Sequence, residues 1–149
     1  MRFTGTATGA AFLALGLNNP TRDSSETPGH SGRFANDGNA ATFWQADADD
    51  TNAWLQIDLE RNVTVSGVKL TFPSEGNWRY KVEISDDGQT NWKPVADQRQ
   101  TTATAKERTD TVRDNATRGR FVRVTFVGTP EAQAAALAEM ELMGIMNQQ

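Results

Sequence analysis

Short segments in which apolar and polar residues alternate recur along the chain, and they constrain its fold more than any other feature. The clearest are WLQIDL at 54–59, RYKVEIS at 79–85 and FVRVTF at 121–126. Successive side chains of a β-strand point to opposite faces, so each segment has the pattern of a half-buried strand. Turn signals separate the segments, such as the Asp-Gly within SDDGQTNW at 85–92. Short strands joined by such loops predict an antiparallel β-sandwich.

Only one segment favours a helix. PEAQAAALAEME at 130–141 has a proline suited to a first helical turn, followed by good helix formers. We expect a short helical turn at most, and then a closing strand around Met140 and Leu142. The polar segment at 101–119 is expected to be an exposed loop with one irregular strand. The predicted fold class is therefore all-β.

Size and charge exclude several classes of function. The chain has 149 residues, 37% of them hydrophobic, which suits one globular domain with a real core. Its formal net charge of -4 provides no basic stripe, so we expect neither a nucleic-acid partner nor binding to an anionic membrane. The chain has no cysteine, which rules out a disulfide framework and a cysteine-based zinc site.

The stretch RFANDGNAATFWQ at 33–45 crowds oxygen-bearing side chains together. Asp37 supplies a carboxylate, Asn39 an amide oxygen and Thr42 a hydroxyl, while Gly38 allows a sharp turn. Asp-Gly-Asn is a common turn sequence, so these residues alone are compatible with a simple turn. They are also compatible with half of a calcium site, because Ca²⁺ takes about 6–8 oxygen ligands and would need a second segment.

Tryptophans are natural platforms for sugar rings when they lie on loops. Trp78 ends the loop FPSEGNWRY at 72–80, beside Asn77 and Arg79, and is the best candidate for stacking on a sugar. Trp54 opens a strand and Trp92 follows a hairpin turn, so both are expected in the core. Trp44 is expected to seal the end of the sandwich beneath the oxygen-rich loop.

Six segments occur in an order that resembles the discoidin or coagulation factor type C family: SSE at 24–26, FANDGNAATFW at 34–44, WLQIDLE at 54–60, YKVEISDDGQTNW at 80–92, GRFVRVTF at 119–126 and LAEMELMG at 137–144. The chain looks most like a family 32 carbohydrate-binding module of a bacterial glycoside hydrolase. This resemblance implies a β-sandwich jelly roll of the galactose-binding-domain type, with about eight main antiparallel strands. Residues 1–9 are then expected to be the tail of a preceding domain or a leader, and residues 10–149 the module.

The resemblance also implies a structural calcium ion. Carried over residue by residue, the expected ligands are the Phe34 carbonyl, Asp37, Asn39, Thr42, the Ala138 carbonyl and Glu139. Such an ion would join an early loop to a late segment and stabilise the fold by closing a long loop.

The same resemblance implies a sugar site on the loops. Glu26 matches a glutamate that contacts sugar in galactose-type members, whereas Gln45 stands where those members have a histidine. The side-chain amides of Gln45 and Asn77 could still form hydrogen bonds to two neighbouring hydroxyls of a sugar. The predicted ligand-binding residues are therefore Glu26, Gln45, Asn77, Trp78 and Arg79.

Three classes of function follow. The first is a noncatalytic module that binds a glycan, such as one with a terminal galactose-like sugar, and holds an adjacent catalytic domain of a glycoside hydrolase near it. The second is an interdomain structural module that keeps the sandwich and the calcium but no longer binds sugar. A glycosidase is the third, although the carboxylates of Asp47, Asp50 and Glu75 form no recognisable pair. The resemblance places such a module in a secreted, periplasmic or cell-surface protein of a bacterium.

Overall fold

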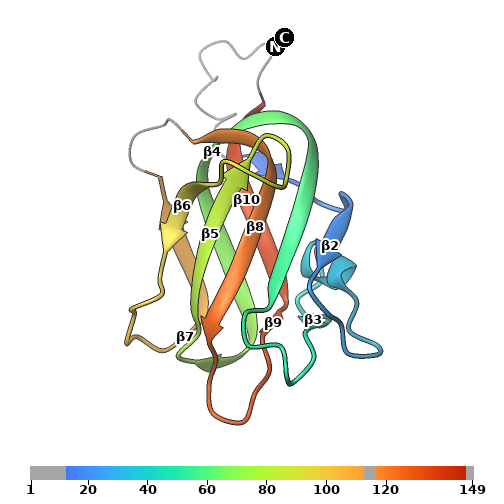
Figure 1. The fold of residues 1–149 in the computed structure, drawn as a ribbon, viewed down its shortest axis with the longest axis vertical. Coiled ribbons are helices and arrows are strands. Elements are labelled where there is room, and N and C mark those ends of the chain that lie inside the picture. The colour runs from blue at the N-terminus through green and yellow to red at the C-terminus, as the bar shows by residue number, and fades with distance from the viewer. Residues whose placement is uncertain (1–12, 113–116, 147–149) are drawn as a thin grey trace.

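The computed structural model describes residues 13–112 and 117–146, and in this range it is built almost entirely from strands (Figure 1). The elements are β1 (Leu13–Leu15), β2 (Thr21–Asp23), the 3₁₀ turn η2 (Gly32–Ala35), β3 (Trp44–Gln45), β4 (Trp54–Gly76), β5 (Arg79–Ser85), β6 (Lys93–Asp97), β7 (Ala105–Thr111), β8 (Arg118–Gly128), β9 (Ala136–Leu137) and β10 (Glu139–Met146). Eight strands pair in one antiparallel system, and β3 pairs with β9 in a second. The predicted all-β fold is confirmed.

The long strand β4 belongs to both layers of the sandwich. Its first part pairs with β2 and β8, and its second part pairs with β10 and β7. Figure 1 shows the consequence, because the β5–β8 layer crosses in front of the layer that contains β10. The direction of β4 changes around Glu60, which has a φ of 66°. No helix in the described part of the chain is long and apolar enough to cross a membrane.

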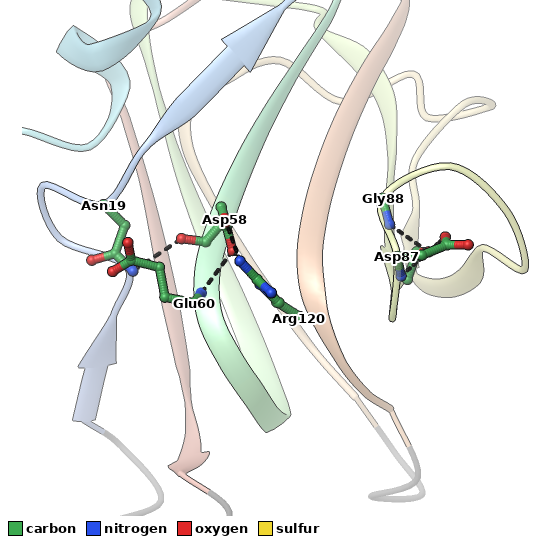
Figure 2. A network of polar contacts seen from close by, with 7 residues as sticks. Asn19, Asp58, Glu60, Asp87, Gly88 and Arg120 are labelled. Carbon is green, nitrogen blue, oxygen red and sulfur yellow. Dashed lines mark hydrogen bonds and ion pairs between the residues drawn. The ribbon is translucent and has the colours of Figure 1, made fainter.

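Polar contacts fix the corner of β4 (Figure 2). The Arg120 guanidinium donates from Nε to Asp58 Oδ1 at 2.7 Å and from Nη2 to Asp58 Oδ2 at 3.0 Å. The Glu60 N–H donates to Asp58 Oδ1 at 2.8 Å, and Asn19 Nδ2 donates to the Asp58 carbonyl at 3.0 Å. The hydrogen bonds from Arg120 hold the pKa of Asp58 below its ordinary value. The corner thereby anchors the segment around Asn19, which follows β1.

The core lies between the two layers and contains the residues that the alternation predicted. Leu55, Ile57, Val82 and Ile84 are fully buried, as are Val122 and Val124. Burying each such side chain contributes about 1.5–3 kcal/mol relative to leaving it exposed. The period of two therefore identified the inward faces of β4, β5 and β8 correctly.

The segment at 130–141 forms no helix. A turn at 131–132 precedes β9, and the closing strand expected around Met140 and Leu142 is confirmed as β10. Ala136 pairs with Gln45 of β3, so tertiary pairing takes the backbone groups that a helix would use internally. The irregular strand expected within 101–119 is β7, and residues 113–116 of that segment lie outside the described residues.

Candidate functional site

Two loops at one end of the sandwich are joined by serine hydroxyls. Ser24 Oγ and Ser25 Oγ donate to Asp50 Oδ2 at 2.6 and 2.7 Å, and the Asp47 N–H donates to Ser25 Oγ at 3.0 Å. Trp44, which was expected to seal the end of the sandwich, is fully buried, and its Nε1 donates to the Ser25 carbonyl at 3.1 Å. The segment that leads to Glu26 is therefore held by contacts made before any ligand binds.

Glu26 borders a shallow hollow of about 460 Å³, which we call the Glu26 hollow. It is lined by Glu26, Thr27, Pro28, Gly29, Ser31, Arg33 and Phe34. The Gly32 N–H donates to Glu26 Oε2 at 2.9 Å, so the start of η2 orients the exposed carboxylate. The hollow brings together a carboxylate, a guanidinium, two hydroxyls and an aromatic ring.

Glu26 also interacts with the carboxyl group of Asp23. Burial and the hydrogen bond to Glu26 raise the pKa of Asp23 to about 7. The same hydrogen bond, together with the one from Gly32, lowers the pKa of Glu26. At neutral pH Glu26 therefore carries the negative charge, and Asp23 holds a proton for part of the time.

Gln45 lies behind the wall of the Glu26 hollow. Its backbone carbonyl accepts from the Thr27 N–H at 2.8 Å, and its Nε2 donates to Thr27 Oγ1 at 3.5 Å. The Gln45 N–H donates to the His30 carbonyl at 3.3 Å, while the His30 ring stacks on Phe43 with centroids 4.2 Å apart. The structure thus brings Glu26 and Gln45 into one loop region, with Gln45 supporting the wall.

The prediction that Trp78 stacks on a sugar is wrong. The side chain is only 2% exposed, its ring stacks on Phe72 with centroids 5.1 Å apart, and Nε1 donates to the Ser74 carbonyl at 2.9 Å. The alternation explains this placement, because Trp78 continues the inward series of Tyr80 and Val82. The ring therefore has no face available to a ligand.

Asn77 and Arg79, two further predicted ligand contacts, form hydrogen bonds to a neighbouring loop. Asn77 Nδ2 donates to the carbonyls of Thr101 and Ala103 at 3.0 and 2.9 Å. Arg79 Nη1 lies 3.4 Å from the Arg99 carbonyl, which accepts its hydrogen bond. Within residues 13–112 and 117–146, no hydrogen bond or hollow joins these two residues to Glu26. They fasten neighbouring loops to the turn between β4 and β5.

Trp54 and Trp92 were expected in the core, and this prediction is also wrong. Both are half-buried, and the Arg123 guanidinium lies between them, 4.0 Å from the Trp54 ring centroid and 4.5 Å from that of Trp92. Arg123 also donates to Gln56 Oε1 at 2.9 and 3.0 Å. Trp54 is next to the inward-facing Leu55 in the same strand, so its side chain points to the outer face of the layer.

The oxygen-rich loop meets the start of β10. The Asn39 N–H donates to Asp37 Oδ1 and to Glu139 Oε2, both at 3.0 Å, although Glu139 is 100 residues away in the sequence. Thr42 Oγ1 donates to Asp37 Oδ2 at 2.7 Å, and Gly38 has the positive φ of 75° that this turn requires. Two carboxylates from distant segments therefore face one another.

The electrostatics of this carboxylate pair fit a hard cation. Glu139 is only 6% exposed, and burial together with the neighbouring Asp37 raises its pKa to about 7. Burial by itself raises the pKa of Asp37. The hydrogen bonds from Thr42 and Asn39 have the larger combined effect, so the pKa of Asp37 is lowered. The described residues contain no group of three or more His, Cys, Asp or Glu side chains suited to a metal. An ion here would need hydroxyl, amide and carbonyl oxygens as further ligands, which are ligands that Ca²⁺ accepts.

The two remaining predicted metal ligands lie on the segments that this loop joins. Phe34 is in η2, whose N-cap Ser31 precedes it, and the Phe34 N–H donates to the Ser31 carbonyl at 3.0 Å. Ala138 directly precedes Glu139, and its N–H donates to the Thr71 carbonyl at 2.7 Å. Both predicted carbonyl ligands therefore belong to backbone that is already held in place.

Comparison with known proteins identifies the family. The family model of the F5/8 type C domain matches residues 20–140. The chain belongs to the F5/8 type C domain family. This match spans β2 to the start of β10, including the Glu26 hollow and the oxygen-rich loop.

Binding modules are among the solved structures similar to this F5/8 type C domain. Chitosan-binding module 2 of a chitosanase/glucanase from Paenibacillus sp. IK-5, in complex with chitotriose, is 33% identical, with a TM-score of 0.75 over 87% of this chain and 98% of that one. Module 1 of the same enzyme is 28% identical, with a TM-score of 0.77 over 89% and 99%.

A module of a glycoside hydrolase from Clostridium perfringens, in complex with GlcNAc-α-1,4-galactose, is 25% identical, with a TM-score of 0.77 over 91% of this chain and 96% of that one. A family 89 glycoside hydrolase from the same organism shares the fold over 15% of its own chain, at 20% identity. The likeness is thus to noncatalytic modules and not to a catalytic domain.

Proposed function

We propose that this F5/8 type C domain is a carbohydrate-binding module and that its sugar site is the Glu26 hollow. One observation carries the proposal: an open, preformed hollow contains the one predicted sugar contact that remains exposed, Glu26. The 33% identical relative in complex with chitotriose supports a sugar as the ligand.

The chemistry of the Glu26 hollow suits a sugar. Glu26 is a charged acceptor for hydroxyl or ammonium donors, and Arg33 offers a planar fork of donors. Ser31 and Thr27 add hydroxyls, which can donate or accept. The hollow is shallow, as expected for a site that covers one side of a sugar residue.

Charge favours an amino sugar over a neutral one. The carboxylates of Asp23, Glu26, Asp47 and Asp50 lie close enough together that the last two raise the pKa of Asp23. Arg33 is the only cationic side chain that lines the Glu26 hollow among the described residues. We therefore propose a glucosamine-containing oligosaccharide as the ligand, since its ammonium groups complement this excess of negative charge. A terminal galactose-like sugar, the sequence-based expectation, is the competing ligand.

A glycan screen followed by calorimetry tests this proposal. We expect the domain to bind chitotriose more tightly than N-acetylated or galactose oligosaccharides. Glu26→Gln keeps an acceptor for the Gly32 N–H but removes the charge, and it should weaken binding by about tenfold. The exposed Glu75 provides the matched control, because Glu75→Gln should bind like the parent. Absence of binding to every glycan would instead favour the interdomain structural module.

We also propose a structural calcium ion at the oxygen-rich loop. Asp37, Asn39, Thr42 and Glu139 would hold it, with the carbonyls of Phe34 and Ala138. The ion would neutralise two facing carboxylates and clip the loop before β3 to the first residue of β10. It would take no part in any reaction, since its contribution is to folding.

Thermal unfolding with and without calcium tests the metal proposal. At a calcium concentration 100 times the dissociation constant, the ion should add about 2.7 kcal/mol of stability. For a domain of this size that corresponds to a Tm rise of about 5–10 °C, which EDTA should abolish. Asp37→Asn should remove the calcium response, whereas Asp86→Asn, at an exposed position, should keep it. An equal calcium response in both variants would contradict the assigned site.

The attachment and the location of the module are part of the same proposal. Related modules belong to a chitosanase/glucanase and to a glycoside hydrolase. We therefore propose that this module holds a glycoside hydrolase near its polymer outside the cell, by raising the effective concentration of substrate.

A further inference from the structure

A second hollow lies on the other side of Arg33 and Phe34. This Asn18 hollow measures about 230 Å³ and is lined by Asn18, Asn19, Arg33, Phe34, Asn36 and Asp37. Arg33 and Phe34 line both hollows, so they form a ridge between them. The Arg33 guanidinium lies over the Phe34 ring, 5.0 Å from its centroid, and this contact orients the ridge.

The lining of the Asn18 hollow includes polar groups that the protein leaves without partners. Asn36 is only 2% exposed, and its Nδ2 donates to the carbonyls of Gly16 and Asn19 at 2.8 and 3.0 Å. Its Oδ1 is buried and accepts no hydrogen bond. A buried carbonyl oxygen without a donor is rare in folded proteins, and each case calls for a partner such as an ordered water.

Asn18 contributes a free amide at the rim of the same hollow. Its backbone N–H donates to the Asn36 carbonyl at 2.8 Å, which fixes the main chain there at a φ of 61°. The side chain is exposed and makes no hydrogen bond within the described residues. Side-chain amides offer two donors and an acceptor in one plane, which matches adjacent hydroxyls of a sugar ring.

The guanidinium of Arg33 is also available to a ligand. Among the residues that the structure describes, no carboxylate lies within ion-pairing distance of the Arg33 guanidinium, whose contact is with the Phe34 ring. The N–H groups of its guanidinium can therefore donate toward either hollow. The ridge would therefore offer a ligand both the apolar ring of Phe34 and the hydrogen-bond donors of the Arg33 guanidinium that lies over it.

We propose that the sugar site consists of two subsites, the Glu26 hollow and the Asn18 hollow, and that its ligand is an oligosaccharide that crosses the Arg33–Phe34 ridge. This inference rests on the function proposed above. One sugar residue occupies each hollow, and the glycosidic bond between them lies over the ridge. The module therefore recognises the interior or end of a chain of at least two residues, and a single terminal sugar fills only half of its site.

Calorimetry with ligands of two lengths tests the second subsite. In calcium-containing buffer, we expect the parent to bind chitotriose about tenfold or more tightly than glucosamine, since a second set of hydrogen bonds is made. Asn18→Gly removes the amide and tolerates the positive φ, so it should weaken binding of chitotriose more than binding of glucosamine and thereby reduce the gain with length. Asn62→Gly, at an exposed position, is the matched control and should leave both affinities unchanged.

The outcomes separate this inference from the function on which it rests. A parent that binds glucosamine and chitotriose equally, or an Asn18→Gly variant that keeps the full gain with length, overturns the second subsite. In that case, loss of binding in Glu26→Gln would still support the single Glu26 hollow. A parent that binds no sugar of either length overturns both proposals. Thermal unfolding of each variant establishes that it is folded before its affinity is compared.

Discussion

Replacing Trp78 by alanine should destabilise the domain and leave its sugar site intact. The indole is 2% exposed and packs against Phe72 and Phe126, with ring centroids 5.1 and 6.0 Å away. Truncating a buried tryptophan to alanine costs about 3–5 kcal/mol, because transfer energy is lost and a cavity remains. We therefore expect a loss of about 4 kcal/mol in the free energy of unfolding, or roughly 8–16 °C in Tm.

Urea denaturation of the parent and two variants measures this effect. Trp78→Phe keeps the stack on Phe72 but loses the hydrogen bond to the Ser74 carbonyl, so its loss should be smaller than that of Trp78→Ala. Folded Trp78→Ala protein, held well below its Tm, should bind chitotriose like the parent. A variant with parent-like stability and no sugar binding would refute this reasoning and restore Trp78 as a ligand contact.

Three further changes test other parts of the fold. Arg123→Met removes the guanidinium between two indoles and should lower the unfolding free energy by about 1–3 kcal/mol in urea titrations; a change below ~0.5 kcal/mol would contradict the stack. Gly144→Ala places a Cβ against the Thr64 carbonyl and should lower Tm by several degrees, whereas a neutral result would mean that β10 shifts freely. Asp23 has a folded-state pKa of about 7, above its ordinary 3.8, so its contribution to stability is fully present below pH 3.8 and is lost as the pH rises through 7. Asp23→Asn should therefore gain Tm relative to the parent between pH 5 and pH 8, and a constant difference would exclude a raised pKa.

Alternation predicted the core well because burial on one face of a strand leaves a local signature. It would also have corrected the predictions for Trp78 and Trp54. Trp78 lies two residues before the buried Tyr80, so its side chain points to the same, inner face. Trp54 lies one residue before the buried Leu55, so its side chain points to the opposite, outer face. The prediction for Trp78 went wrong because its place at the end of a loop was given more weight than the period of two, and the prediction for Trp54 went wrong because a tryptophan at the start of a strand was expected in the core whatever its face.

The candidate sites depended on information that is not local. The approach of Glu139 to Asn39 across 100 residues was expected from the family resemblance, and no spacing rule would have found it. The proximity of Glu26 and Gln45 was expected in the same way. The ridge of Arg33 and Phe34 could not be predicted, because it requires the 3₁₀ turn η2 to place consecutive side chains between two hollows. Calcium binding itself stays a prediction.

Mapping amide chemical shifts during a chitotriose titration tests the central claim most directly. The account predicts that shifts concentrate on residues 26–34, the segment that lines the Glu26 hollow, and extend across the ridge to Asn18 and Asn36. Shifts centred on Asn77 and Arg79 would move the sugar site to the turn between β4 and β5. A titration without shifts would contradict a carbohydrate-binding function for this ligand class.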